Sequence, residues 1–109
     1  MITIPIKPLS VNQCYQGRRF RTKEYDRYEK DVITLLVAIK LPPPPYSVYY
    51  EFGFSNPMSD IDNPIKGLQD ILQKRYGFND RDIYEMTVVK EIVSKGNEYV
   101  KFEITHLKK

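Results

Sequence analysis

Apolar and aromatic side chains recur at three- and four-residue spacing in two stretches of the chain, which predicts two amphipathic helices. The first is expected over residues 22–40, with Thr22 as its N-cap. The second is expected to start with Asn63 as capping residue and Pro64 at the first helical position, and to end at Gly77 in a left-handed conformation. The expected buried stripes are Tyr25, Tyr28, Val32, Leu35, Leu36 and Ile39 in the first helix, and Ile65, Leu68, Ile71 and Leu72 in the second.

Four further stretches are rich in β-forming residues and predict strands. Residues 1–7 are expected to form a short strand that ends at Pro8. Residues 46–54 are expected to form a second strand with one apolar face, made of Val48, Tyr50, Phe52 and Phe54. Residues 83–93 and 98–106 are expected to pair as a hairpin, with its turn at Lys95, Gly96 and Asn97.

Two connecting segments complete the pattern. Residues 10–23 are predicted to form an extended polar loop, and the four prolines at 42–45 a stiff polyproline connector within the domain. The element order β-α-β-α-β-β predicts an α+β fold, a single domain over residues 1–109 in which two helices pack against a small mixed sheet of about four strands.

Composition narrows the function classes. The chain has 109 residues, of which 41% are hydrophobic, and it contains no apolar run of the roughly 18 residues that a membrane span needs. Residues 1–5 do not resemble a signal peptide, and Cys14 is the single cysteine, so a reducing cytosol is expected. The formal net charge of +3 permits a nucleic-acid partner without arguing for one.

Asp60 and Asp62 are the most informative candidate site residues. In extended backbone, residues two apart point to the same side, so both carboxylates are expected to address one point. Two close carboxylates repel each other and favour a bound cation, and oxygen ligands without neighbouring His or Cys favour Mg²⁺ or Mn²⁺. The alternative is that both residues only close a turn and cap a helix.

Lys66 follows in the first turn of the second predicted helix, where the helix dipole disfavours a cation. A lysine beside metal-binding carboxylates is suited to hold a phosphate or to stabilise charge in phosphoryl transfer. The alternative is a solvated lysine. Either Asp80 or Asp82, before the third long strand, is a candidate to complete the carboxylate cluster.

These residues resemble the RusA-type Holliday junction resolvases, crossover junction endodeoxyribonucleases of bacteria and phages. The run Asp60-Ile61-Asp62-Asn63-Pro64-Ile65-Lys66 is similar to that family's Asp-x-Asp-Asn-x-x-Lys pattern, and Asp70-Ile71-Leu72 to its Asp-x-Leu. Gly77-Phe78-Asn79-Asp80 resembles the turn before the family's third catalytic aspartate, and Pro8-Leu9-Ser10-Val11-Asn12 its opening. The chain departs from the family at Pro57-Met58-Ser59, where basic residues are common, and before Asp80, where an Asp-Asp pair is common.

The resemblance implies a homodimer that nicks two strands of a four-way DNA junction symmetrically during recombination and repair. It implies that Asp60, Asp62 and Asp80 hold Mg²⁺, that Lys66 acts on the phosphate, and that Asn63, Asp70 and Asp82 support the site. DNA contacts are expected from a basic, aromatic-flanked loop and from a possible apolar wedge, comprising Asn12, Arg18, Arg19, Arg21, Lys23 and Met58. The alternatives are a nuclease for flaps or forks, a non-catalytic junction-binding module, and a structural protein–protein module.

Overall fold

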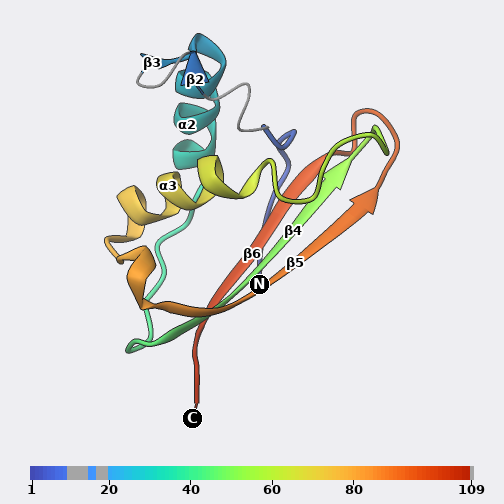
Figure 1. Cartoon of the computed structure of the whole chain (residues 1–109). Helices are drawn as coiled ribbons and strands as arrows, with labels where there is room; N and C mark the ends of the chain where they lie inside the picture. The colour runs from blue at the N-terminus through green and yellow to red at the C-terminus, as the bar shows by residue number, and fades with distance from the viewer. Residues whose placement is uncertain (10–14, 17–19, 109) are drawn as a thin grey trace.

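The computed structural model describes residues 1–9, 15–16 and 20–108 and has the predicted α+β architecture (Figure 1). The sheet strands are β1 (Ile2–Ile4), β4 (Tyr46–Phe54), β5 (Ile83–Ile92) and β6 (Tyr99–His106), and the helices are α2 (Lys23–Leu35) and α3 (Ile65–Tyr76). A single 3₁₀ turn, η1 (Asp80–Asp82), precedes β5. The short strands β2 (Tyr15–Gln16) and β3 (Phe20–Arg21) pair with each other inside the segment predicted to be a loop.

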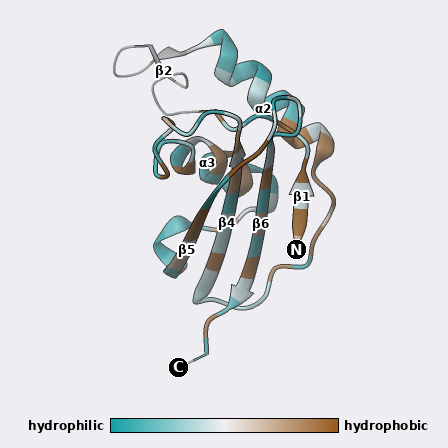
Figure 2. Ribbon diagram, turned by 90° about the vertical axis from the view of Figure 1, so that its right-hand side faces the viewer, coloured by the Kyte–Doolittle hydropathy of each residue, from teal (hydrophilic) through white to brown (hydrophobic). Residues whose placement is uncertain are grey.

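The four-stranded sheet has the order β1-β6-β4-β5 (Figure 2). β4 pairs in parallel with β5 and antiparallel with β6, so α3 is the crossover helix of a β-α-β unit. The predicted hairpin between the last two strands is therefore wrong, because β4 lies between them. The turn itself exists, with Gly96 at φ 97° and the Asn97 N–H donating to the Ser94 carbonyl at 2.9 Å.

Both helices lie on one face of the sheet (Figure 1), and the core fills the space between the two layers. The predicted apolar face of β4 is confirmed, since Val48, Tyr50, Phe52 and Phe54 are all buried. The predicted stripe of α3 is buried as well, except for the half-buried Ile65. Full burial of one such aliphatic or aromatic side chain stabilises the fold by about 1.5–3 kcal/mol.

α2 ends at Leu35, five residues before the predicted end. Leu36 is already extended, yet it is buried, so its predicted burial is confirmed although its predicted helical conformation is wrong. The carbonyl of Val37, which no longer lies in a helix, accepts a hydrogen bond from the Tyr76 hydroxyl at 2.7 Å. Leu35 itself remains 45% exposed, contrary to the predicted stripe.

Of the capping residues predicted for the two helices, Thr22 and Gly77 are confirmed and Asn63 is wrong. The Thr22 hydroxyl accepts a hydrogen bond from the Tyr25 N–H at 3.1 Å, as expected of an N-cap. Gly77 ends α3 with φ 78° and ψ 21°, a left-handed conformation that favours glycine. Asn63 does not cap α3, because the helix begins at Ile65 and Pro64 occupies the cap position without a side-chain hydrogen bond.

The proline-rich connector bends at Pro44 and Pro45 instead of running straight, and the peptide bond between them is cis. The end of the chain holds this connector in place. The Leu107 N–H donates to the Pro45 carbonyl at 2.9 Å, and His106 Nδ1 lies 2.7 Å from the Pro43 carbonyl oxygen.

The face of the sheet opposite the helices carries a polar cluster around Glu51. Its carboxylate accepts hydrogen bonds from the hydroxyls of Tyr49, at 2.5 Å, and Tyr99, and lies 3.5 Å from the Lys101 ammonium. The hydrogen bonds from Tyr49 and Tyr99 hold the pKa of Glu51 below its usual value. The Tyr99 ring lies directly over Gly53, where a Cβ would overlap it.

Candidate functional site

The segment between β4 and α3 carries the two central candidate residues, and its backbone is not extended as predicted. Residues 61–64 form turns. The Asn63 N–H lies 3.4 Å from the Asp60 carbonyl oxygen, and the Ile65 N–H lies 3.3 Å from that of Asp62. The argument that extended backbone aims Asp60 and Asp62 at one point is therefore wrong, although both side chains are exposed and accessible to a ligand.

Lys90 of β5 anchors this segment to the sheet. Its ammonium donates to the carbonyl of Pro57 at 2.8 Å and to that of Ser59 at 2.5 Å. The Asn56 side-chain oxygen accepts from the Met58 N–H at 2.9 Å and tightens the same turn. These contacts fix the backbone immediately before Asp60, and the sequence alone gave no signal for them.

A polar pocket of about 420 Å³ opens at the carboxyl end of β4. Asp60 and Asn63 line it together with Lys7, which follows β1, and Glu98, which precedes β6. Hydrogen bonds from the Ser55 hydroxyl and nearby backbone, and the charge of Lys7, lower the pKa of Glu98. Lys7 and Glu98 were not predicted as site residues, because only the strand order brings them beside Asp60.

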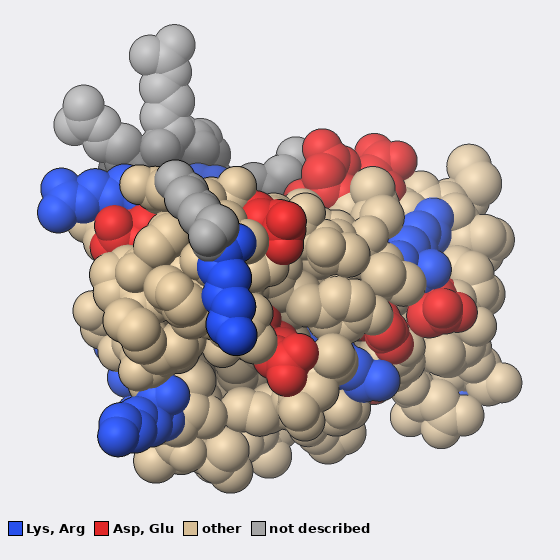
Figure 3. All heavy atoms as spheres, turned by 90° about the horizontal axis from the view of Figure 1, so that it is seen from below, with Lys and Arg blue, Asp and Glu red and all other residues tan. Residues whose placement is uncertain are grey.

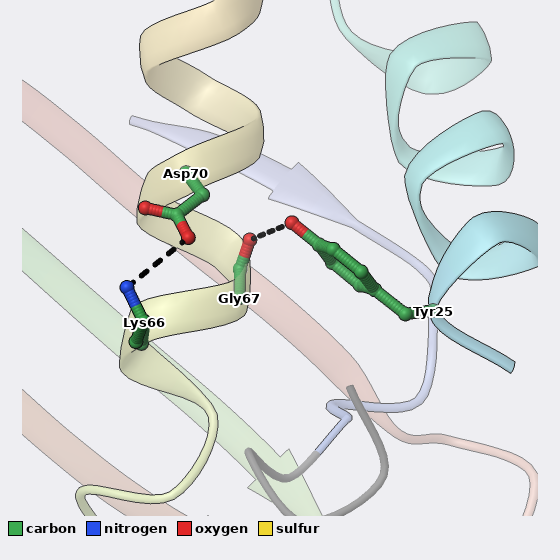
Figure 4. A network of polar contacts seen from close by, with 4 residues as sticks. All are labelled: Tyr25, Lys66, Gly67 and Asp70. Atoms are coloured by element: carbon green, nitrogen blue, oxygen red, sulfur yellow. Dashed lines mark hydrogen bonds and ion pairs between the residues drawn. The ribbon is translucent and has the colours of Figure 1, made fainter. Parts of the chain in front are cut away.

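Lys66 and Asp70 form an exposed ion pair along α3, with 3.5 Å between Nζ and Oδ2 (Figure 4). Lys66 is thus in the first turn of the helix, as predicted, and its side chain leans toward Asp70 one turn later. On the neighbouring residue, the Gly67 carbonyl lies 3.5 Å from the Tyr25 hydroxyl, which links α3 to α2. This link helps to fix the helix that carries Lys66.

Asp80 and Asp82 lie at the opposite end of the sheet from Asp60. They form η1, which leads directly into Ile83, and Ile83 pairs with Tyr46 at the start of β4. Asp60 shares its pocket with Phe54, the last residue of β4. Eight residue steps of β-strand separate Tyr46 from Phe54, a distance of about 26 Å.

Three aspartates that far apart do not form one site within one chain. Among the residues that the structure describes, no three His, Cys, Asp or Glu side chains gather closely enough to hold a metal ion. Within one copy of the chain, the three aspartates predicted to hold Mg²⁺ therefore do not lie together.

The predicted DNA contacts are only partly described. Asn12, Arg18 and Arg19 lie outside the described residues, and of Arg21 only the backbone in β3 is described. Lys23 is exposed at the start of α2.

Met58 is 83% exposed and lines the pocket. On the face of the molecule in Figure 3, basic and acidic side chains are interspersed among the residues drawn in colour. That face therefore does not show one continuous basic surface for DNA.

Comparison with protein-family models finds no match, and comparison with curated proteins finds no significantly similar sequence. Within the described ranges, no helix has the length and apolar character required to cross a bilayer.

Proposed function

We propose that this chain is a structure-specific endodeoxyribonuclease that resolves four-way DNA junctions by paired, symmetric nicks. The proposal rests on one observation above all. The run from Asp60 to Lys66 has a resolvase-like sequence, and the side chains of Asp60, Asp62 and Lys66 are exposed next to a pocket at the carboxyl end of a parallel strand. Functional groups are commonly presented at that end of parallel strands.

The charges along this segment suit a reaction at a phosphodiester. Lys66 supplies an exposed ammonium that can neutralise a phosphate oxygen, and Asp70 lies 3.5 Å away and orients it. Asn63 lines the pocket beside Asp60 and offers both a donor and an acceptor. The proposed cofactor is Mg²⁺, with Mn²⁺ as a substitute, because the candidate ligands are carboxylates.

One geometric observation favours a second candidate function. The separation of Asp80 from Asp60 within one chain is the arrangement expected of a junction-binding module that does not cut DNA. Such a module binds junctions equally with and without Mg²⁺ and leaves them uncut at any concentration of divalent ion.

The test compares the wild type with Asp62→Asn, using Asp31→Asn as a matched control at an exposed position on α2. Asp62→Asn is expected to abolish nicking of a labelled four-way junction while binding persists or tightens, because a negative charge facing phosphate is removed. Asp31→Asn is expected to nick like the wild type. Equal nicking by Asp62→Asn and the wild type contradicts the proposed site, and joint loss of nicking and binding contradicts the proposed role.

A further inference from the structure

The pocket at the carboxyl end of β4 has walls of two kinds. Pro8, Phe54 and Met58 supply apolar surface, whereas Asn63 and Glu98 supply groups that form hydrogen bonds. Its volume of about 420 Å³ lies within the range of about 300–1,000 Å³ that is usual for small-molecule sites. Apolar surface combined with a few polar groups is how proteins bind small organic molecules, so the pocket suits a ligand of that class.

The charges in the pocket favour an uncharged ligand. Asp60 belongs to the proposed catalytic turn, and the other two ionisable side chains of the lining, Lys7 and Glu98, have opposite charges. Glu98 is held in place, because its carboxylate accepts hydrogen bonds from the Ser55 hydroxyl and the Gly96 N–H, both at 2.8 Å. Beyond Asp60, the lining therefore has no surplus positive charge for a phosphate, and a neutral nucleobase fits it better.

Met58 lines the pocket and is 83% exposed, more than any other large apolar side chain that the structure describes. Its backbone is nevertheless fixed. The Met58 N–H donates to the Asn56 side chain at 2.9 Å. The carbonyls of the two neighbouring residues, Pro57 and Ser59, accept hydrogen bonds from Lys90. A flexible thioether on a fixed turn is suited to insert between stacked bases.

We infer that the pocket receives one nucleobase from the centre of a branched DNA, and that Met58 fills the gap that this base leaves in the stack. The inference rests on the proposed function and names the part of the substrate that the site binds. Because Asp60 lines the same pocket, the phosphate attached to the captured nucleotide lies next to the candidate catalytic turn. Lys66, which follows in α3, is exposed outside the pocket lining and is available to this phosphate.

Capture of a base gives selectivity for branched DNA without reading its sequence. A base leaves the stack at least cost where pairing or stacking is already disturbed. The strands at a branch point meet this condition, whereas those in a continuous duplex do not. Met58 and the pocket are therefore expected to favour a branch point over a continuous duplex.

The experiment measures base extrusion in EDTA, so that no strand is cut. The fluorescent base 2-aminopurine, which becomes brighter when it leaves the stack, replaces each nucleotide at the branch point of a four-way junction in turn. A probe in the middle of one arm is the DNA control. At saturating wild-type protein, fluorescence is expected to rise about threefold or more at a branch-point position and to stay unchanged in the arm.

Two pairs of variants link the signal to the pocket. Met58→Ala removes the wedge and is expected to reduce the rise by about half or more, whereas Leu35→Ala, which shortens another exposed apolar side chain, leaves it unchanged. Ser59→Phe fills the pocket with a ring and is expected to abolish the rise. Thr34→Phe adds the same ring at an exposed position on α2 and leaves the rise unchanged. A titration of each variant ensures that the junction is saturated.

The outcomes separate the base pocket from the nuclease function. Junction binding without a rise at any branch-point position, or a wild-type rise in both Met58→Ala and Ser59→Phe, overturns the base pocket even if the protein nicks DNA. The expected pattern in a protein that never nicks a junction with Mg²⁺ supports the base pocket and refutes the nuclease function alone. A wild type that binds no junction contradicts both.

Discussion

Lys90 is expected to hold the turn that carries the candidate site, and Lys90→Met tests this directly. The substitution keeps the aliphatic stem and removes the ammonium that donates to the carbonyls of Pro57 and Ser59 at 2.8 and 2.5 Å. Each of these hydrogen bonds contributes about 1 kcal/mol, the net value of an ordinary hydrogen bond, because water competes for the exposed ammonium. The turn is therefore expected to lose about 2 kcal/mol of local stability.

That loss has a local readout in amide hydrogen exchange. The N–H groups of Met58 and Ser59 are hydrogen-bonded within the turn, to Asn56. A loss of 2 kcal/mol in the free energy of opening accelerates their exchange about 30-fold. The matched control is Lys95→Met, at an exposed position beyond β5, which is expected to leave both rates unchanged. Unchanged exchange at Met58 and Ser59 in Lys90→Met would refute the anchoring role.

Three other predictions concern the open face of the sheet and the third aspartate. Gly53→Ala is expected to lower the free energy of unfolding in urea by about 1–3 kcal/mol, because the new methyl group displaces the Tyr99 ring; an unchanged midpoint contradicts the close approach. Because the pKa of Glu51 is depressed, its contribution is present above about pH 4.5 and is lost as the pH falls through the folded-state pKa. The urea midpoint of Glu51→Gln should therefore fall less on acidification than that of the wild type, and parallel curves would exclude this source of acid sensitivity. Of Asp80→Asn and Asp82→Asn, the first is expected to abolish nicking and the second to leave it nearly normal; two active variants would remove a third carboxylate at η1.

Most of the fold follows from local patterns. The alternation along β4 and the spacing in α3 identified the buried faces, because a buried strand face or helix stripe requires apolar residues at regular spacing in the sequence. Thr22 and Gly77 were predictable because helix ends have strong local chemistry.

Strand pairing was not predictable by the same means. The turn at Gly96 looks like a hairpin turn, but β4 lies between β5 and β6 and pairs with both, and no local pattern in the sequence specifies this long-range pairing. The end of α2 was also missed, because Leu36 is buried from extended backbone while its four-residue spacing from the buried Val32 fits a continuing helix equally well.

The candidate site, too, was predictable where local sequence patterns describe it and not where long-range strand pairing builds it. The sequence pattern located Asp60, Asp62 and Lys66, and all three are exposed. It did not identify Lys7, Glu98 or Lys90, which reach the same region from other strands. It also did not indicate that the parallel pairing of β4 with β5 sends Asp80 to the far end of the sheet.

The most direct test of the proposed nuclease activity is incubation of a labelled four-way DNA junction with the wild-type protein, with and without Mg²⁺. The account predicts paired nicks at symmetric positions near the crossover when Mg²⁺ is present, and an intact, protein-bound junction when it is absent. A junction that stays uncut at every concentration of Mg²⁺ or Mn²⁺ would contradict the proposed nuclease function.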